Sequence, residues 1–190
     1  MLSQLLRPLA YLTIRHTSRA PLYINWVTPA LISGALVLVA HFMKGDIAVF
    51  GDSGAVSRTL SFLQSLPGFY IAALAAVATF ANPDMQKLMP GTPPTISILY
   101  NGKAAVVQLT RRRFLSSMFA YLTALSIILT VVAIGAVSLA TPLREMVDIW
   151  WHPWLKGAFS FFFFGFGIQL LVVTMWGIYY LGERVHTPDP

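Results

Sequence analysis

The sequence contains no cysteine and little charge. Asp, Glu, Lys and Arg make up 11% of its 190 residues, whereas an ordinary soluble domain has about 25%. Without cysteine, the chain can form no disulfide, no thiolate zinc site and no cysteine nucleophile. Because 56% of the residues are hydrophobic, a soluble domain of this size could not bury all of its apolar surface. These shortages point to lipid as the solvent for much of the chain.

Four long apolar runs, all free of Asp, Glu, Lys and Arg, account for most of the hydrophobic residues. A helix needs about 20 apolar residues to cross the hydrocarbon core of a bilayer. The runs cover residues 21–42, 60–81, 114–140 and 157–181. We therefore predict an all-α integral membrane protein with four transmembrane helices, in a single membrane domain that covers residues 1–190.

The first 20 residues precede the first run. Three arginines interrupt the leucines of this segment, and Pro8 breaks it, which is untypical of a secretory signal. We expect residues 1–20 to form an arm at the membrane interface, with its leucines reaching into the headgroup layer. These leucines are Leu2, Leu5, Leu6, Leu9 and Leu12.

Lys and Arg are distributed unevenly between the two predicted sides. The arm, the second connection and the tail hold nine of the 13, and the other two connections hold four, which four acidic residues balance. Since cytoplasmic loops carry the excess of Lys and Arg, we predict that both termini and the central loop, residues 82–113, are cytoplasmic. On the opposite side, we expect residues 142–156 to lie on the surface as a short amphipathic piece.

The central loop is the largest segment outside the runs. A Pro- and Gly-rich stretch, Met89 to Pro94, is followed by two β-prone segments separated by Asn101 and Gly102. Asn-Gly is the strongest short hairpin signal, because both residues tolerate the positive φ of a type I′ turn. We therefore predict a small β-hairpin here. A lone hairpin is marginal in water, so it should lean on a neighbouring copy, the end of the helices or a partner.

The sequence offers no catalytic set and no metal site. The segment Gly51-Asp52-Ser53-Gly54 resembles the surroundings of a protease serine, but it lies in a short connection and is interpreted as a polar turn. The four histidines are scattered, without the i, i+4 spacing of a helical metal site. We expect no catalytic, cofactor-binding or metal-binding residues and no enzymatic activity.

Basic residues accompany the predicted hairpin. One interpretation is that the arginines before the third run anchor the chain to anionic lipid of the bilayer. The other is that they form, with the hairpin tip, a docking surface for a cytoplasmic effector protein; no direct binding to nucleic acid is expected. The candidate docking residues are Tyr100, Asn101, Gly102, Lys103, Arg111, Arg112 and Arg113.

Small and polar residues inside the runs suggest contacts between helices. Gly68, Ala72 and Ala76 recur every four residues, which lets a second helix approach closely, in this chain or in another copy. The amide of Gln169 needs a partner in lipid, so it should join helices or line a pore. The favoured function is a non-enzymatic, homo-oligomeric membrane scaffold or sensor that recruits an effector. The alternative is an oligomeric channel or holin-like pore.

The chain resembles the KwaA family, the four-span membrane subunits of the bacterial Kiwa anti-phage defence system. The resemblance lies in chain size, in the four runs, and in the stretch from Met89 to Pro94 followed by Leu109-Thr-Arg-Arg-Arg-Phe114. It implies an inner-membrane homo-oligomer that senses phage attack and passes the signal to a cytoplasmic effector subunit. It implies no role for any individual residue.

Overall fold

The computed structural model describes residues 6–42, 48–51, 53–79, 81–100 and 103–184. It is mostly helical, with four helices long and apolar enough to cross a membrane and one two-stranded sheet. The number and order of the predicted helices are therefore confirmed, and so is the position of the hairpin. The four candidate spans are Ala20–Phe42, Ala55–Thr79, Arg111–Met146 and Ile149–Gly182.

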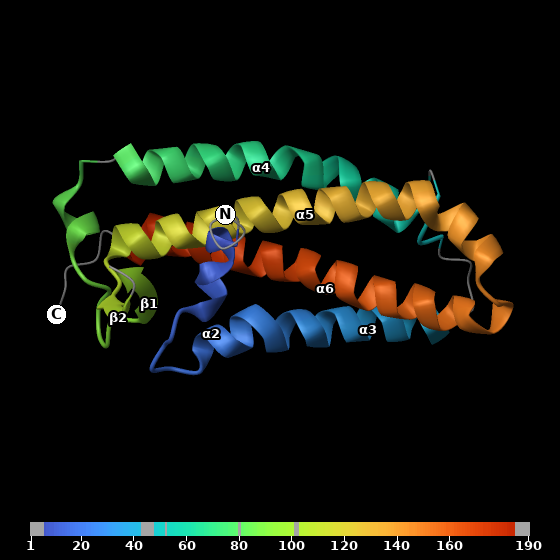
Figure 1. The fold of residues 1–190 in the computed structure, drawn as a ribbon, viewed down its shortest axis with the longest axis horizontal. Helices are drawn as coiled ribbons and strands as arrows, with labels where there is room; N and C mark the ends of the chain where they lie inside the picture. The colour runs from blue at the N-terminus through green and yellow to red at the C-terminus, as the bar shows by residue number, and fades with distance from the viewer. Residues whose placement is uncertain (1–5, 43–47, 52, 80, 101–102, 185–190) are drawn as a thin grey trace. The chain divides into compact units, whose positions relative to one another are not determined.

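Figure 1 shows the order of the elements along the chain. The first span consists of α2 (Ala20–Leu22), a π-helical turn η2 (Tyr23–Val27) and α3 (Thr28–Phe42). The others are α4 (Ala55–Thr79), α5 (Arg111–Met146) and α6 (His152–Tyr179), which continues into a π-helical turn η5 (Tyr180–Arg184). Short 3₁₀ helices are η1 (Arg7–Thr13), η3 (Pro83–Gln86) and η4 (Ile149–Trp151), and the strands are β1 (Thr95–Tyr100) and β2 (Lys103–Gln108).

The helices are longer than the apolar runs. The second span begins at Ala55, and α5 continues through Pro142 to Met146. The expected amphipathic piece at residues 142–156 is therefore not a separate element. Its residues form the last turn of α5, the 3₁₀ turn η4 and the start of α6. Hydropathy misses such ends because a helix continues past the hydrocarbon, where its polar side chains reach water.

The chain divides into two compact units. Unit 1 comprises Met1–Pro21, Gly68–Ala124 and Val173–Pro190, and unit 2 comprises Leu22–Pro67 and Leu125–Val172. Because α4, α5 and α6 run past these limits, each contributes residues to both units. Unit 1 also contains η1 and the hairpin, whereas unit 2 contains α3 and the turn between α5 and α6.

Unit 2 is held by close helix approach and polar contacts. The Ser33 hydroxyl on α3 donates a hydrogen bond of 2.7 Å to the carbonyl of Phe161 on α6. A Cβ atom built on Gly165 would lie 3.7 Å from the Ser33 side chain, which is ordinary van der Waals contact. The rings of Phe159 and Phe163, both on α6, contact each other, and Phe159 also contacts Phe50, which lies before α4. Small residues at a contact are what allow helices to associate in an apolar solvent.

Candidate docking module

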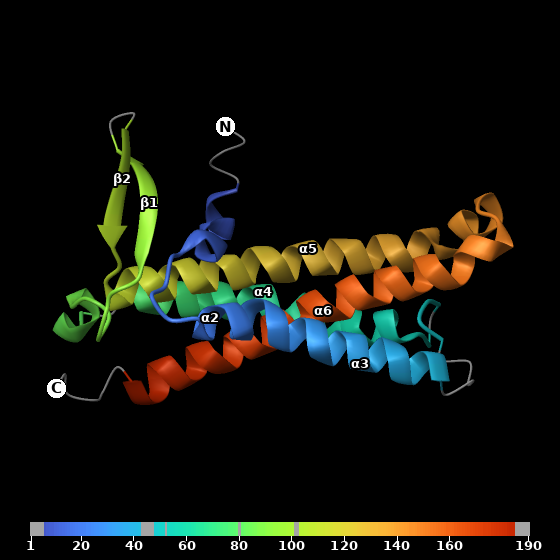
Figure 2. The same ribbon diagram turned by 90° about the horizontal axis from the view of Figure 1, so that it is seen from below.

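Five of the seven predicted docking residues, all but Asn101 and Gly102, belong to a structured part of unit 1, which we call the docking module. It consists of residues 7–16, 83–100 and 103–110, and the first turn of α5, residues 111–114. Figure 2 shows the hairpin projecting from the start of α5, on the same side of this helix as η1. The module therefore joins a segment before the first span to the connection between the second and third spans.

An aromatic residue fixes the N-terminal arm to the start of α5. Tyr11, on η1, is only 3% exposed. Its ring stacks on Tyr121 with centroids 5.1 Å apart and packs against Phe114 at 6.1 Å. Of the leucines expected to reach into the headgroups, Leu6 is exposed, whereas Leu2 and Leu5 lie outside the described residues. The arm is thus packed into the protein at Tyr11, which the interfacial interpretation did not anticipate.

Two pairs of backbone hydrogen bonds fix the base of the hairpin. Arg15 and Thr95 exchange both of theirs, at 2.9 and 3.0 Å, so the arm lies along the outer side of β1. On the other side, Leu88 pairs with Thr110, with bonds from Met89 to Leu109 and from Arg111 to Lys87. The hairpin is therefore supported at its base by two other segments of its own chain.

The hairpin has an inner and an outer face. Its strands are antiparallel with Thr95 opposite Gln108 and Ile96 opposite Val107, and residues opposite each other share a face. Ile96 is buried, whereas Val106, on the other face, is 70% exposed. The prediction of two β-prone segments is confirmed by this register. The turn residues Asn101 and Gly102 lie outside the described residues, and for Tyr100 and Lys103 only the backbone pairing is described.

The three arginines at the start of α5 have different environments. Arg111 is 2% exposed and its backbone N–H donates to Lys87. Arg112 donates a hydrogen bond of 3.3 Å to the carbonyl of Ala78, at the end of α4, where a cation favours the negative end of the helix dipole. Arg113 is exposed. The prediction of three docking arginines is therefore corrected: Arg111 is buried and cannot contact a partner in this structure.

Polar contacts stabilise the loop that leads into the hairpin. The side chain of Asn82 accepts a 2.9 Å hydrogen bond from the N–H of Asp84 at the start of η3. Asp84 forms a 2.8 Å ion pair with Lys87 on the surface. The hydroxyl of Tyr180 donates to the sulfur of Met89 at 2.9 Å. These contacts tie residues 82–89 to themselves and to the end of α6.

One histidine of the arm, His16, packs against α5. The ring of His16 meets Phe114 edge to face, with centroids 6.1 Å apart. Burial lowers the pKa of His16 from its usual value of 6.5, because the charged form loses hydration there. The neutral imidazole is therefore the form that suits the docked arm.

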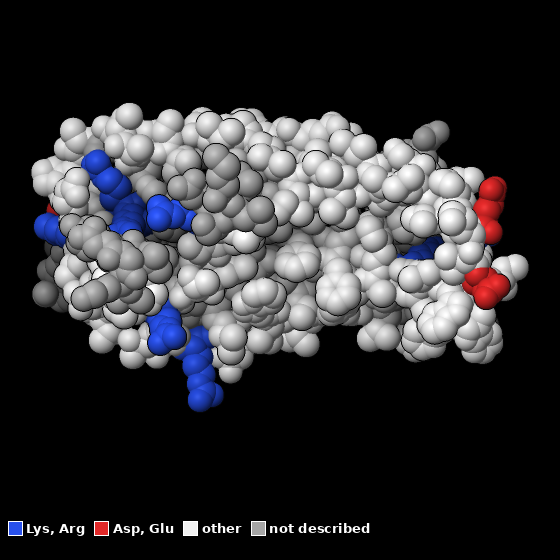
Figure 3. Space-filling model, in the orientation of Figure 1, with Lys and Arg blue, Asp and Glu red and all other residues white. Residues whose placement is uncertain are grey.

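The two units differ in net charge. By sequence, unit 1 carries nine Lys and Arg against three Asp and Glu, whereas unit 2 carries four of each. The net charge of +6 thus belongs to unit 1. Figure 3 shows Lys and Arg side chains around the hairpin and the start of α5. A positive field of this kind attracts acidic proteins or anionic headgroups.

The predicted helix-packing residues do not all face other helices. Gly68 and Ala72 are exposed, Ala76 is half-buried, and the buried face of α4 carries Leu63, Leu66, Tyr70 and Val77. Gly68 and Ala72 therefore do not pack inside this chain. Gln169 is 1% exposed in unit 2. Its burial agrees with a role between helices of this chain.

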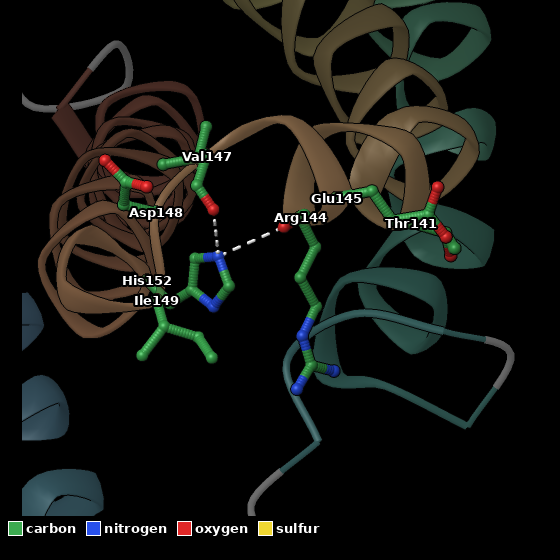
Figure 4. Close-up of a pocket in the computed structure, with 7 residues that line it drawn as sticks. All are labelled: Thr141, Arg144, Glu145, Val147, Asp148, Ile149 and His152. Carbon is green, nitrogen blue, oxygen red and sulfur yellow. Dashed lines mark hydrogen bonds between the residues drawn. The ribbon is translucent and has the colours of Figure 1, made fainter.

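A second polar site lies at the turn between α5 and α6. The Nε2–H of His152 is shared between the carbonyls of Arg144, at 3.1 Å, and Val147, at 2.9 Å. Figure 4 shows the ring turned toward these carbonyls, beside a hollow of about 580 Å³, while the carboxylate of Asp148 points away from it. Among the described residues, no three of His, Asp and Glu are grouped to hold a metal. The histidine therefore caps the end of α5.

No family model, curated protein or solved structure matches this chain.

The arm is the part of the module that sequence reasoning missed. Tyr11 lies among leucines in a segment interpreted as interfacial, and the extended Arg15 pairs only through its backbone. In the sequence, the only indication of this packing is Tyr11, three residues before the β-branched Ile14. It is too weak to predict a tertiary contact, because an interfacial arm also favours tyrosine.

Proposed function

We propose that this protein is a non-enzymatic, multi-pass scaffold or sensor of the bacterial inner membrane that recruits a cytoplasmic effector protein through its docking module. The observation that carries the proposal is the coincidence of two features in unit 1. The unit holds nine of the 13 Lys and Arg, and it holds a hairpin anchored on both sides of its base. A rigid, positively charged element outside the spans is suited to binding a protein.

The charge distribution supports a cytoplasmic orientation of the module and of both termini. Lys and Arg are retained on the cytoplasmic side of membrane proteins, whereas Asp and Glu have little effect. The N-terminal arm, the central loop and the tail all belong to unit 1. A module on this side meets cytoplasmic proteins rather than the outer surroundings of the cell.

Shortening the hairpin tests recruitment without disturbing its base. We would replace residues 97–106 by Asn-Gly, so that the new turn joins Ile96 to Val107, which face each other in the register. The bonds between Arg15 and Thr95 are kept. After cross-linking in cells, a protein that co-purifies with the full chain should be absent from the shortened variant, while membrane insertion is unchanged. Recovery of the same protein with both would contradict the proposal.

We also propose that the protein is a homo-oligomer that assembles through α4. Six small residues follow a spacing of four and three along this helix, and all six are exposed, on the side opposite its buried face. Such a stripe allows close approach of a second backbone. The residues of this small-residue face are Ser61, Ser65, Gly68, Ala72, Ala75 and Thr79.

A leucine in this face should separate the copies. We expect Ala72→Leu to lower the mass of the detergent-solubilised particle, because the larger side chain holds two helices apart. Ala78→Leu is the matched control, since Ala78 is exposed on α4 outside the small-residue face. Equal particle masses for Ala72→Leu and the unchanged chain would reject α4 as the contact.

A part in anti-phage defence is proposed on the resemblance to the KwaA family alone. Plaque counts on a host that expresses the chain with its genomic neighbours would test it. Equal counts with and without the chain would contradict this part of the proposal and leave recruitment untouched.

A further inference from the structure

On the outer edge of β2, backbone groups point away from β1, and no residue in the described part of the chain pairs with them. Thr95 exchanges both of its backbone hydrogen bonds with Arg15, so its N–H and C=O point away from β2. In an antiparallel pair, two residues that lie opposite each other either exchange both hydrogen bonds or both point their N–H and C=O away from each other. These two arrangements alternate, so each recurs at every second residue along the strand. Gln108 is opposite Thr95. The N–H and C=O of Gln108 and of Val106 therefore face outward, along the free side of β2.

The sequence protects only the turn end of this edge, where β2 begins with Lys103. Edge strands are usually blunted by Lys, Pro or a bulge, because their free backbone groups accept a further strand. Residues 104–107 read Ala-Ala-Val-Val, and Val106 and Gln108 are exposed. An apolar β-branched residue on an open edge favours strand pairing.

The chain itself begins a neighbouring strand and then leaves it. Residues 87–89 pair with residues 109–111 beyond the end of β2. Pro90 follows, which has no N–H to continue the ladder, and Gly91 adopts φ +81°, which turns the backbone away. The pairing therefore stops before Gln108, and among the described residues none pairs with the edge above it.

The positive charge of the module indicates which kind of strand would bind at the edge of β2. Arg113 is exposed in the first turn of α5, which follows β2, and Arg15 is exposed beside β1 on the other edge. Unit 1 as a whole carries a net charge of +6. A second copy would bring the same positive charge against this edge. A strand rich in Asp or Glu would instead gain from the field, which steers binding and favours partners of opposite sign.

We infer that β2 is a strand-addition site, at which an extended acidic segment of the partner pairs with the backbone of Val106 and Gln108. The mode is β-augmentation, in which main-chain hydrogen bonds provide affinity and side chains provide selectivity. This inference rests on the proposed function, because it specifies how the docking module holds its partner.

A proline substitution tests the inference at one backbone atom. Val106→Pro removes an N–H that points outward and takes no part in the hairpin ladder, a position at which edge strands tolerate proline. Val106→Thr is the matched control, because it keeps the N–H and the β-branch. The probe is a short labelled peptide in which Val and Glu alternate, and its binding to the full chain in a neutral nanodisc is followed by fluorescence anisotropy.

We expect the peptide to bind the unchanged chain and Val106→Thr equally. Binding to Val106→Pro should be about tenfold weaker, the effect of losing one or two hydrogen bonds. The same peptide with N-methyl groups on alternate residues should also bind weakly, which tests pairing without altering the protein. A peptide with Lys in place of Glu should not bind.

Three results would overturn the inference. They are equal binding to Val106→Pro, equal binding of the Lys peptide, and a lower particle mass for Val106→Pro, which would identify a second copy as the occupant. The hairpin-shortened variant separates this inference from the proposed function. If shortening the hairpin abolishes recruitment and Val106→Pro leaves peptide binding unchanged, the module docks a partner by another surface.

Discussion

The two units of the chain achieve cohesion in different ways. Unit 1 buries six aromatic side chains, and the ring of Tyr11 contacts both Phe114 and Tyr121. In unit 2 most buried polar side chains are uncharged; they are Asn25, Ser33, Ser126, Ser160 and Gln169. Unit 2 thus relies on the small and polar contacts by which helices associate in an apolar solvent, whereas unit 1 also buries large aromatic rings.

The largest expected effect is the loss of the ring at the centre of unit 1. Phe114 contacts Tyr11, His16, Trp176 and Tyr180. Phe114→Ala should destabilise unit 1 by about 3–5 kcal/mol, and hydrogen exchange should rise in the arm and the hairpin base. Exchange in α3 should not change.

Phe69→Ala is the control for that variant. Phe69 also belongs to unit 1, but its side chain is exposed, so its loss should leave exchange in the arm unchanged. Equal effects of the two substitutions would remove the aromatic cluster from the explanation.

A smaller effect is expected in unit 2. Ser33→Ala deletes the hydrogen bond from α3 to the carbonyl of Phe161, a contact between helices of the kind that contributes about 0.6–2 kcal/mol in membranes. Exchange of α3 amides should rise while the arm is unaffected. Thr130→Val is the control, because the Thr130 hydroxyl bonds only within its own helix, to Ser126. A rise in exchange in the arm would contradict the separation of the units.

The smallest effect concerns pH. Because burial lowers the pKa of His16 from 6.5 in the docked arm, the undocked arm binds a proton more readily. The stabilisation is complete above pH 6.5 and is lost as the pH falls below it, toward the pKa of the docked form. The protection factors of the arm amides, which are corrected for the pH dependence of the intrinsic exchange rate, should therefore fall on acidification, and His16→Gln should abolish this dependence. An unchanged pH profile in His16→Gln would assign it to another group.

The helices and the hairpin could be predicted from the sequence, because the helices depend on composition over many residues and the hairpin on one turn signal. Four apolar runs were sufficient to place the helices, and Asn101-Gly102 was sufficient to place the hairpin. The ends at Ala55 and Met146 were missed, because hydropathy reports the hydrocarbon and not the hydrogen-bonded helix.

Contacts between distant segments could not be predicted in the same way. The burial of Arg111 and the packing of Tyr11 depend on tertiary structure, which a charge count or a leucine pattern does not encode. The ladder on α4 was recognised through Gly68 and Ala72, but Ala76 turns partly inward and Ala75 takes its place on the exposed face. Ala75 and Ala76 differ by one position along the helix, and only the packing of α4 shows which of them faces outward.

The central claim is the side of the membrane on which the docking module lies, and the absence of native cysteine makes it measurable. Single variants Ser97→Cys, in the hairpin, and Ser53→Cys, in the loop before α4, place one thiol at an exposed site of each unit. With a membrane-impermeant maleimide on cells whose outer membrane is opened, we predict labelling of Ser53→Cys at once and of Ser97→Cys only after the inner membrane is permeabilised. Immediate labelling of Ser97→Cys would contradict the account.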